Sequence, residues 1–348
     1  MDKPPYNELP KPMEHHEVPE NHGTAREREV IIIGGGLAGL SAAIYLGRAL
    51  RDVLIIDAGE SLAIWEPEVQ NYLGFEKIDG RELLRRARDQ ALCYGAEIVR
   101  EEVEGVSKDS GYFNVRAKKA SFSSRRLLLA TGVYHLPPKI PAVNECVGKS
   151  MFFCKDCDGY RVQGKPVIIA GANNGAVDYA LGLLMFTECV ILLTNGEAPR
   201  WDDEHERWLR EYEVPVYTEQ ITQVDHDQGC IRSVTLGSGQ KVAAACLFTT
   251  RGDICHNHLA QQLGAALDQD GQVIVDNEQR TNVPGLYAAG CVTPANCQMI
   301  IAAGHGATAA QAINRDLFDE SLRTGSLKAR RSRQVARGNA EPIFLSHN

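Results

Sequence analysis

The sequence predicts an α/β fold with two three-layer domains, each built on a strand–turn–helix–strand unit. An apolar run at residues 29–33 leads into a glycine turn at 34–39 (GGGLAG), and a similar run at 165–170 leads into a second turn at 171–176 (GANNGA). An apolar run that ends in such a turn is typical of a parallel strand that feeds a helix. Because this order of elements occurs twice, we expect one copy in each domain.

The composition is that of a globular protein large enough for two domains. The chain has 348 residues, 44% of them hydrophobic, and a net charge of −8, so general nucleic-acid binding is not favoured. No apolar run is long enough to span a membrane. Residues 1–26 are rich in Pro, Glu and His without an apolar core, which predicts a disordered segment rather than a signal peptide. We therefore expect a cytoplasmic location.

The first glycine turn predicts a dinucleotide site. Gly34, Gly36 and Gly39 precede a helix from residue 37 to about 51, and the next strand, 53–56, ends at Asp57. A helix N-terminus offers free N–H groups to a diphosphate, and a carboxylate about 20 residues further on binds a ribose. The alternative is a turn that only lets the helix pack closely. We prefer the nucleotide site because strand, turn, helix, strand and acid follow in order.

The ten cysteines contain one close pair, Cys154 and Cys157, separated by Lys and Asp. The length of the chain and the lack of a secretory signal argue against a disulfide framework, because cytosolic cysteines stay mostly reduced. The pair is therefore interpreted as a working redox couple in an otherwise scattered set. A zinc half-site is the alternative, with the run Cys-His-Asn-His at 255–258 as its local partner.

The remaining motifs resemble those of the low-molecular-weight thioredoxin reductase family of flavoproteins, over residues 28–318. The resemblance rests on the glycine turn and on five further motifs: NYLGF at 71–75 with IDG at 78–80, ATG at 130–132, CKDCDG at 154–159 and TNVPGLYAAG at 281–290. It implies two Rossmann-like domains of the FAD/NAD(P) type and a homodimer.

The resemblance also implies the domain boundaries. Residues 27–141 and 254–318 would form a split FAD-binding domain, and 142–253 would form an inserted NAD(P)-type domain that carries the redox pair. Prolines 137, 138 and 141 make a stiff first crossing, and the second falls near 251–258. Residues 319–348 would form a basic tail, interpreted as a solvated segment or, alternatively, as a peripheral membrane contact.

The resemblance assigns roles to individual residues. Cys157 would face the flavin, Cys154 would meet the substrate, and Asp158 would carry protons. The start of the helix at residue 298 would direct its dipole at the flavin pyrimidine. The expected FAD contacts outside the glycine turn are Asn71, Thr131, Gly132, Gly290, Cys291, Gln298, Met299 and Ile300.

Several positions depart from the family pattern. The second turn has Asn173 where the family has a glycine that lets the backbone approach a pyrophosphate. The family's His-Arg-Arg run, which holds the 2′-phosphate of NADPH, is replaced by Thr-Asn-Gly-Glu at 194–197, with Arg200 as a lone cation. Cys291 replaces an aspartate, and Cys297 replaces the arginine before Gln298. We therefore expect the FAD site to be altered but intact and the NADPH site to be lost.

Two branches of the family share this combination. They are the diflavin-linked disulfide oxidoreductases of photosynthetic bacteria and the small-molecule dithiol oxidases. The aspartate of the CDG motif favours the diflavin branch. In that case a dithiol reduces Cys154–Cys157, and electrons pass to FAD, to a second flavin and to a quinone or oxygen. The alternatives are a thioredoxin reductase fed by NADPH or ferredoxin, and a non-catalytic flavin redox sensor.

Overall fold

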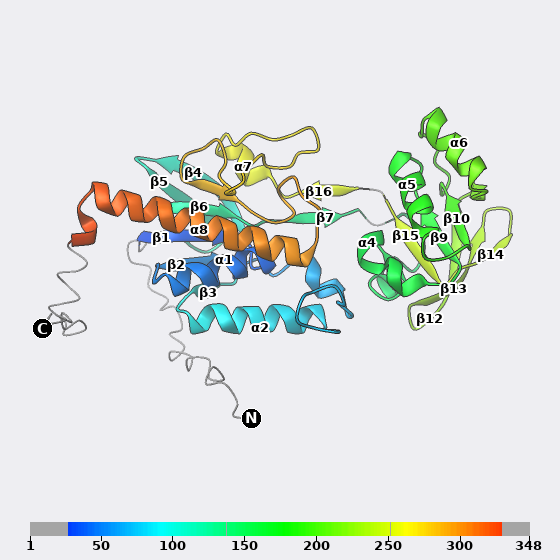
Figure 1. Cartoon of the computed structure of the whole chain (residues 1–348), viewed down its shortest axis with the longest axis horizontal. Helices are drawn as coiled ribbons and strands as arrows, with labels where there is room; N and C mark the ends of the chain where they lie inside the picture. The colour runs from blue at the N-terminus through cyan, green and yellow to red at the C-terminus, as the bar shows by residue number, and fades with distance from the viewer. Residues whose placement is uncertain (1–26, 137, 251, 329–348) are drawn as a thin grey trace, which may run out of the picture.

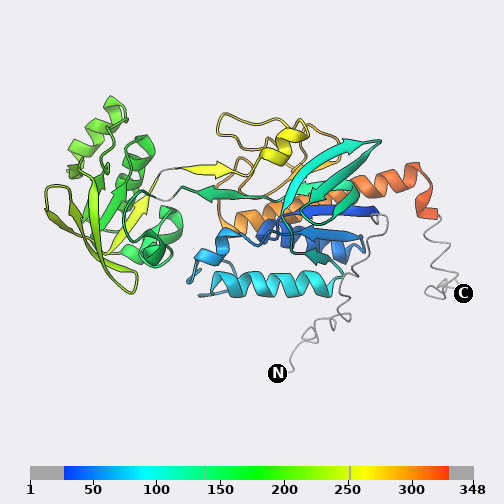
Figure 2. The same ribbon diagram turned by 180° about the vertical axis from the view of Figure 1, so that it is seen from behind.

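The computed structural model describes residues 27–136, 138–250 and 252–328. The predicted N-terminal segment and most of the predicted basic tail lie outside these residues. The chain forms two lobes (Figures 1 and 2). Their sheets fall within the predicted split and inserted domains, whose boundaries stay predictions.

The first lobe contains a seven-stranded sheet in the order β3-β2-β1-β6-β5-β4, with β17 beside β6. The parallel β1 and β2 are fully apolar at their centres because helices or loops cover both faces of the sheet. Its strands are β1 (Glu27–Ile33), β2 (Val53–Ile56), β3 (Glu97–Val99), β4 (Val103–Asp109), β5 (Tyr112–Ala117), β6 (Ser121–Leu129) and β17 (Leu286–Ala288). Its helices are α1 (Leu37–Arg48), η1 (Leu62–Trp65), α2 (Gly80–Cys93), α7 (His258–Gln262) and α8 (Met299–Arg323).

The second lobe repeats the same plan with a parallel sheet in the order β11-β10-β9-β15-β8 and an antiparallel sheet in the order β12-β13-β14. Its strands are β8 (Met151–Phe152), β9 (Val167–Ala170), β10 (Val190–Leu193), β11 (Val216–Tyr217), β12 (Ile221–Asp227), β13 (Cys230–Leu236), β14 (Lys241–Ala243) and β15 (Cys246–Thr249). Its helices are α3 (Val143–Cys146), α4 (Lys155–Asp158), η2 (Gly159–Val162), α5 (Asn174–Leu183) and α6 (Asp203–Glu211).

Two short antiparallel strands, β7 (Val133–His135) and β16 (Asp253–Cys255), connect the lobes. Figure 1 shows them as the bridge between the two bodies. The imidazole of His135 stacks on Phe153 at 5.0 Å between ring centroids and contacts the Asp253 carboxylate at 2.5 Å. The bridge therefore joins the redox segment to the first lobe.

The ends of two helices differ from the sequence-based expectation. Helix α1 ends at Arg48, before the expected residue 51, because Leu50 takes a left-handed conformation with φ of 58°. Helix α8 continues to Arg323, past the expected 317, because Glu320 pairs with Arg125 and Arg126 on β6. The predicted tail from 319 thus begins inside α8. Within the described residues, no helix is long and apolar enough to cross a bilayer.

Helices α1 and α8 cross at a point where only glycine fits. A Cβ atom on Gly306 of α8 would lie 2.0 Å from the carbonyl oxygen of Ala38 on α1. The neighbouring Gly304, also in α8, has nothing within 4 Å of such an atom. The close approach places the start of α8 over the turn that precedes α1.

We expect Gly306→Ala to lower the free energy of unfolding by about 1–3 kcal/mol, because the added methyl forces the two helices apart. Gly304→Ala is the matched control. It should leave stability unchanged or raise it by up to about 1 kcal/mol, since alanine favours helix. Urea unfolding of both variants measures the difference. Equal stability of the two variants would contradict the packing role of Gly306.

Candidate active site

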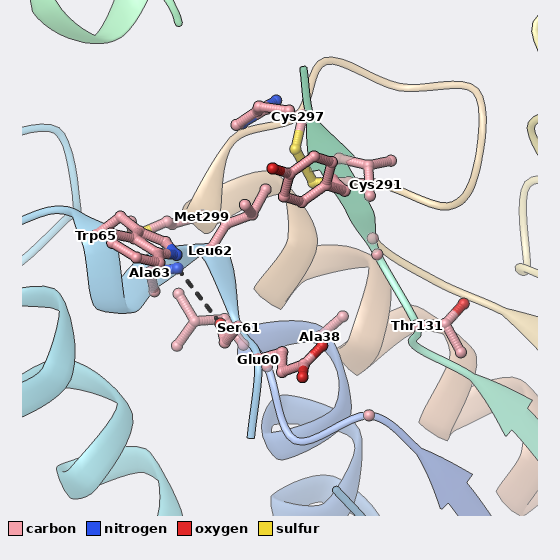
Figure 3. A pocket seen from close by; sticks show the side chains of 18 of the residues that line it. Ala38, Glu60, Ser61, Leu62, Ala63, Trp65, Thr131, Cys291, Cys297 and Met299 are labelled. Atoms are coloured by element: carbon pink, nitrogen blue, oxygen red, sulfur yellow. Dashed lines mark hydrogen bonds between the residues drawn. A yellow bond between two sulfur atoms is a disulfide. The ribbon is translucent and has the colours of Figure 1, made fainter. Parts of the chain in front are cut away.

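A cavity of about 470 Å³ opens between the two lobes, within the range of about 300–1,000 Å³ usual for small-molecule sites. The first lobe contributes the glycine turn, the segment 56–71, the segment 130–135 and the loop before α8. The second lobe contributes Val143, Asn144, Val147, Phe153, Cys154, Cys157 and Asp158. Figure 3 shows part of this lining, with Ala38 and Ser61 on one side and the Cys291–Cys297 bond on another.

The first glycine turn has the geometry of an anion site. Gly34 has φ of 110°, and a Cβ there would lie 2.2 Å from the carbonyl oxygen of Ala130. Gly36 is the N-cap of α1 and has no side chain to occupy the helix N–H groups, so these remain available to a diphosphate at the cavity. The turn therefore fits the diphosphate of FAD.

Asp57 holds the shape of this turn. Its Oδ1 atom accepts hydrogen bonds from Gly35 N at 3.1 Å and Gly59 N at 2.9 Å, and its Oδ2 atom accepts one from Arg88 at 2.7 Å. The residue is 4% exposed and lines the cavity. Asp57 was predicted as a ribose ligand, and Arg88 is a partner that sequence reasoning missed.

The loop before α8 brings several predicted residues to the same cavity. Gln298 accepts a hydrogen bond from Asn71 at 3.0 Å. The hydroxyl of Thr131 donates to the carbonyl of His256 at 2.7 Å. The predicted flavin contacts that line the cavity are Gly34, Gly36, Asp57, Asn71, Thr131, Gly132, Gly290, Cys291, Gln298 and Met299.

Two predicted contacts are not among the lining residues. Gly39 packs inside the turn, where a Cβ would lie 2.0 Å from the carbonyl oxygen of Gly34. Ile300 is 39% exposed. A role for Gly39 or Ile300 in flavin binding stays a prediction.

Cys154 and Cys157 form a disulfide with Cα atoms 5.3 Å apart. Cys154 is the N-cap of the single-turn helix α4, and its sulfur accepts hydrogen bonds from Cys157 N at 3.1 Å and Gln298 Nε2 at 3.4 Å. Donors directed at a sulfur stabilise its thiolate form. Among the described residues, no cluster of three or more His, Cys, Asp and Glu side chains is placed to hold a metal ion.

Two carboxyl groups with raised pKa values lie beside the redox pair. Burial raises the pKa of Asp158, and a hydrogen bond from Arg161 at 2.9 Å opposes the rise. Burial raises the pKa of Glu66 to about 7, and the charge of Asp158 adds to this while Arg161 opposes it. Both carboxyl groups line the cavity. Sequence reasoning does not single out Glu66, because Asp158 and Arg161, which act on its pKa, belong to the other lobe.

A second disulfide joins Cys291 and Cys297, with Cα atoms 4.9 Å apart. It closes the loop between β17 and α8 and lines the cavity (Figure 3). The expectation of one close pair in an otherwise scattered set is therefore corrected. The sequence does not single out this pair, because the two cysteines are six residues apart and their pairing depends on how the loop that contains Pro294 folds.

The second glycine turn differs from the first at its helix. Asn173 is the N-cap of α5, and its side-chain oxygen accepts a hydrogen bond from Ala176 N at 3.0 Å. Asn174 exchanges hydrogen bonds with Asp202, donating to its carboxylate at 2.8 Å and accepting from its N–H at 3.0 Å. The N–H group of Ala176 at the start of α5 is thus already bonded within the protein.

Two nucleotide-type lobes and a disulfide on a shared cavity define a flavin-dependent disulfide oxidoreductase. The model of the pyridine nucleotide-disulphide oxidoreductase family matches residues 28–313, and the chain belongs to this family. The match confirms the predicted class of enzyme and supports FAD as its cofactor.

Individual relatives agree with this assignment. The thioredoxin reductase of Treponema pallidum (strain Nichols) is 31% identical, over 82% of this chain and 95% of that protein. The thioredoxin reductase of Bacillus subtilis (strain 168) is 27% identical, over 85% and 97% of the respective chains. The chain is thus a thioredoxin reductase-like flavoprotein.

Solved structures confirm the predicted fold. The crystal structure of HlmI matches with a TM-score of 0.82 and 31% identity, over 88% of this chain and 97% of that chain. The putative thioredoxin reductase TrxB from Bacillus anthracis matches with a TM-score of 0.78 and 29% identity, over 84% and 99%.

The raised pKa of Glu66 predicts a pH-dependent stability. The folded chain holds this proton up to about pH 7, whereas an ordinary glutamate loses it near 4.5. The free energy of unfolding should therefore fall as the pH rises from about 4.5 through 7, with Glu66 contributing roughly 1–3 kcal/mol.

Glu66→Gln removes this titration, so the variant should lose less stability than the wild type between pH 5 and pH 8. Chemical denaturation at the two pH values measures the difference. An identical loss in both proteins would show that Glu66 ionises normally in the folded chain.

Proposed function

We propose that this enzyme exchanges electrons between FAD and a dithiol or disulfide substrate through Cys154–Cys157, without NADPH. The observation that carries the proposal is the contrast between the two helix starts. The N–H groups of α1 face the cavity uncapped, while Asn173 caps α5. A diphosphate at α5 would have to displace this cap.

The charges near α5 support the same proposal. Arg200 is the lone cation proposed from the sequence, and it pairs with Glu197 at 3.1 Å. Asn195 uses its side chain to accept a hydrogen bond from Ile221 N at 2.8 Å. Asp202 stands directly beside the cap. A 2′-phosphate needs unpaired cations, and carboxylates in their place disfavour it.

The residues of the cavity can perform thiol–disulfide exchange. FAD, when bound at the first glycine turn, supplies two-electron redox chemistry beside the pair. The sulfur of Cys154 is the one that receives hydrogen bonds, so it is the better stabilised thiolate. A substrate thiolate that attacks this pair forms a mixed disulfide, and a second substrate thiolate resolves it and leaves both cysteines reduced. Burial raises the pKa of Asp158, and it raises the pKa of Glu66 to about 7, so these carboxyl groups are suited to exchange protons with the pair.

The proposed direction runs from dithiol to flavin, with a second flavin near α5 and a quinone or oxygen as acceptor. A second flavin would need contacts other than the capped N–H group of Ala176 on α5. Its presence is tested by the ratio of released flavin to protein chains, where two per chain supports it and one contradicts it. Homodimer formation and a peripheral membrane contact also stay predictions.

A second candidate is a thioredoxin reductase that receives electrons from NADPH, and the names of the relatives favour it. In that case electrons run from flavin to the disulfide of thioredoxin. A ferredoxin-fed enzyme is a variant of this candidate that agrees with the capped α5. A redox sensor, the third alternative, would show no turnover with dithiols or thioredoxin.

We expect anaerobic mixing with a dithiol, such as dihydrolipoamide, to bleach the flavin absorbance, and mixing with NADPH to leave it unchanged over the same time. Stopped-flow spectroscopy at 450 nm, the usual flavin band, measures both. Fast bleaching by NADPH would contradict the proposal and support the second candidate.

Cys157→Ser should abolish flavin reduction by the dithiol, because it removes the sulfur that faces the flavin in the proposed arrangement. Cys189→Ser is the control, since Cys189 is free and exposed. The same anaerobic experiment applies to both variants. Flavin bleaching by the dithiol at the wild-type rate in Cys157→Ser would refute the role of this residue.

A further inference from the structure

Both disulfides of the described chain line the same cavity. The other six cysteines are free, including the buried Cys146 and Cys246. The disulfides of the described residues thus occur at the cavity and do not form a framework that crosslinks the fold. Cys291 and Cys297 are partly exposed there, as are Cys154 and Cys157. A disulfide exposed in a cavity is accessible to another thiol.

Gln298 lies next to both disulfides. Gln298 follows Cys297 directly, and its amide nitrogen lies 3.4 Å from the sulfur of Cys154. Its amide oxygen accepts a hydrogen bond from Asn71, which fixes the orientation of the amide. The Cα atom of Cys297 is about 3.8 Å from that of Gln298, whose side chain contacts Cys154.

The loop that carries the second pair is held at one end and open at the other. Near Cys291, Val292 and Thr293 are fully buried, and the Thr293 hydroxyl donates to the carbonyl of Gly290 at 2.7 Å. Near Cys297, Pro294 and Asn296 are exposed. Cys297 is therefore the sulfur that can approach Cys154 with little disturbance of the core.

We propose that Cys291–Cys297 is a second redox-active disulfide, which exchanges with the Cys154–Cys157 pair. The proposal rests on the proposed function only for the supply of electrons to Cys154–Cys157. In the forward step the Cys154 thiolate attacks the sulfur of Cys297, forms a Cys154–Cys297 bond and releases the Cys291 thiolate.

The second step completes the exchange. The Cys157 thiolate attacks Cys154, re-forms the Cys154–Cys157 disulfide and releases the Cys297 thiolate. The dithiol of the first pair is oxidised, the second disulfide is reduced by the same two electrons, and the two protons of the first pair pass to Cys291 and Cys297. The total number of electrons is unchanged by the exchange, and the re-formed Cys154–Cys157 disulfide can accept a further pair, so the chain can store one more electron pair than the flavin and Cys154–Cys157 together.

The test follows the thiols of each pair separately. The holoenzyme is reduced anaerobically by light with a deazaflavin and EDTA, trapped with iodoacetamide and digested, and the cysteine peptides are quantified by mass spectrometry. We expect reduced Cys291 and Cys297 in the wild type and two more thiols per chain than in the Cys291→Ser/Cys297→Ser variant. Cys189→Ser/Cys230→Ser, which changes two free exposed cysteines, should reduce Cys291 and Cys297 to the same extent as the wild type.

The route is tested in the Cys154→Ser/Cys157→Ser variant, which should keep Cys291–Cys297 oxidised while its flavin is reduced. Reduction of the second pair in this variant to the wild-type extent would overturn the exchange. So would a second pair that stays oxidised in the wild type while Cys154–Cys157 is reduced. This second outcome is read in the wild type, so it does not depend on how well the serine variants fold.

Failure of the proposed function gives a different result. If light reduces the flavin and Cys154–Cys157 itself stays oxidised, the electron transfer proposed for that pair is wrong. One equivalent of dihydrolipoamide per chain then supplies the thiols directly. Reduced Cys291 and Cys297 that depend on Cys154 under these conditions would still support the exchange, and their absence would overturn it.

Discussion

The close contact between α1 and α8 governs the geometry of the site. Gly306 lets the two helix backbones approach, and this fixes the start of α8 above the turn at residues 34–36. The loop that precedes α8 then faces the same space as the turn, and it carries Cys291, Cys297 and Gln298. The diphosphate site and the loop cysteines thus line one cavity.

The two lobes together place two carboxyl groups at the cavity that holds the redox pair. Asp158 arrives from the second lobe and Glu66 from the first, and each loses water in the contact. Arg161 pairs with Asp158 and lies 3.9 Å from Glu68, so it offsets part of this cost. The result is a pair of carboxyl groups with raised pKa values, next to sulfur atoms that must gain and lose protons.

The sequence predicted the parts of the fold that depend on local pattern. The strands before both turns, the turns themselves and the Cys154–Cys157 pair follow from apolar runs and residue spacing. The pairing of Cys291 with Cys297 and the role of Glu66 do not, because each depends on a loop conformation or on the other lobe. The effect of Asn173 was predicted as crowding of a phosphate, and the structure adds the hydrogen bond by which this side chain satisfies α5.

The three donors around Asp57 have a consequence for how the cofactor binds. Backbone N–H groups of Gly35 and Gly59 and the guanidinium of Arg88 hold Asp57, and with it the shape of the first turn, through contacts within the chain. A preorganised site loses little conformational entropy when its ligand arrives, so more of the contact energy appears as affinity. The ordering of the first turn is then already complete when FAD binds there.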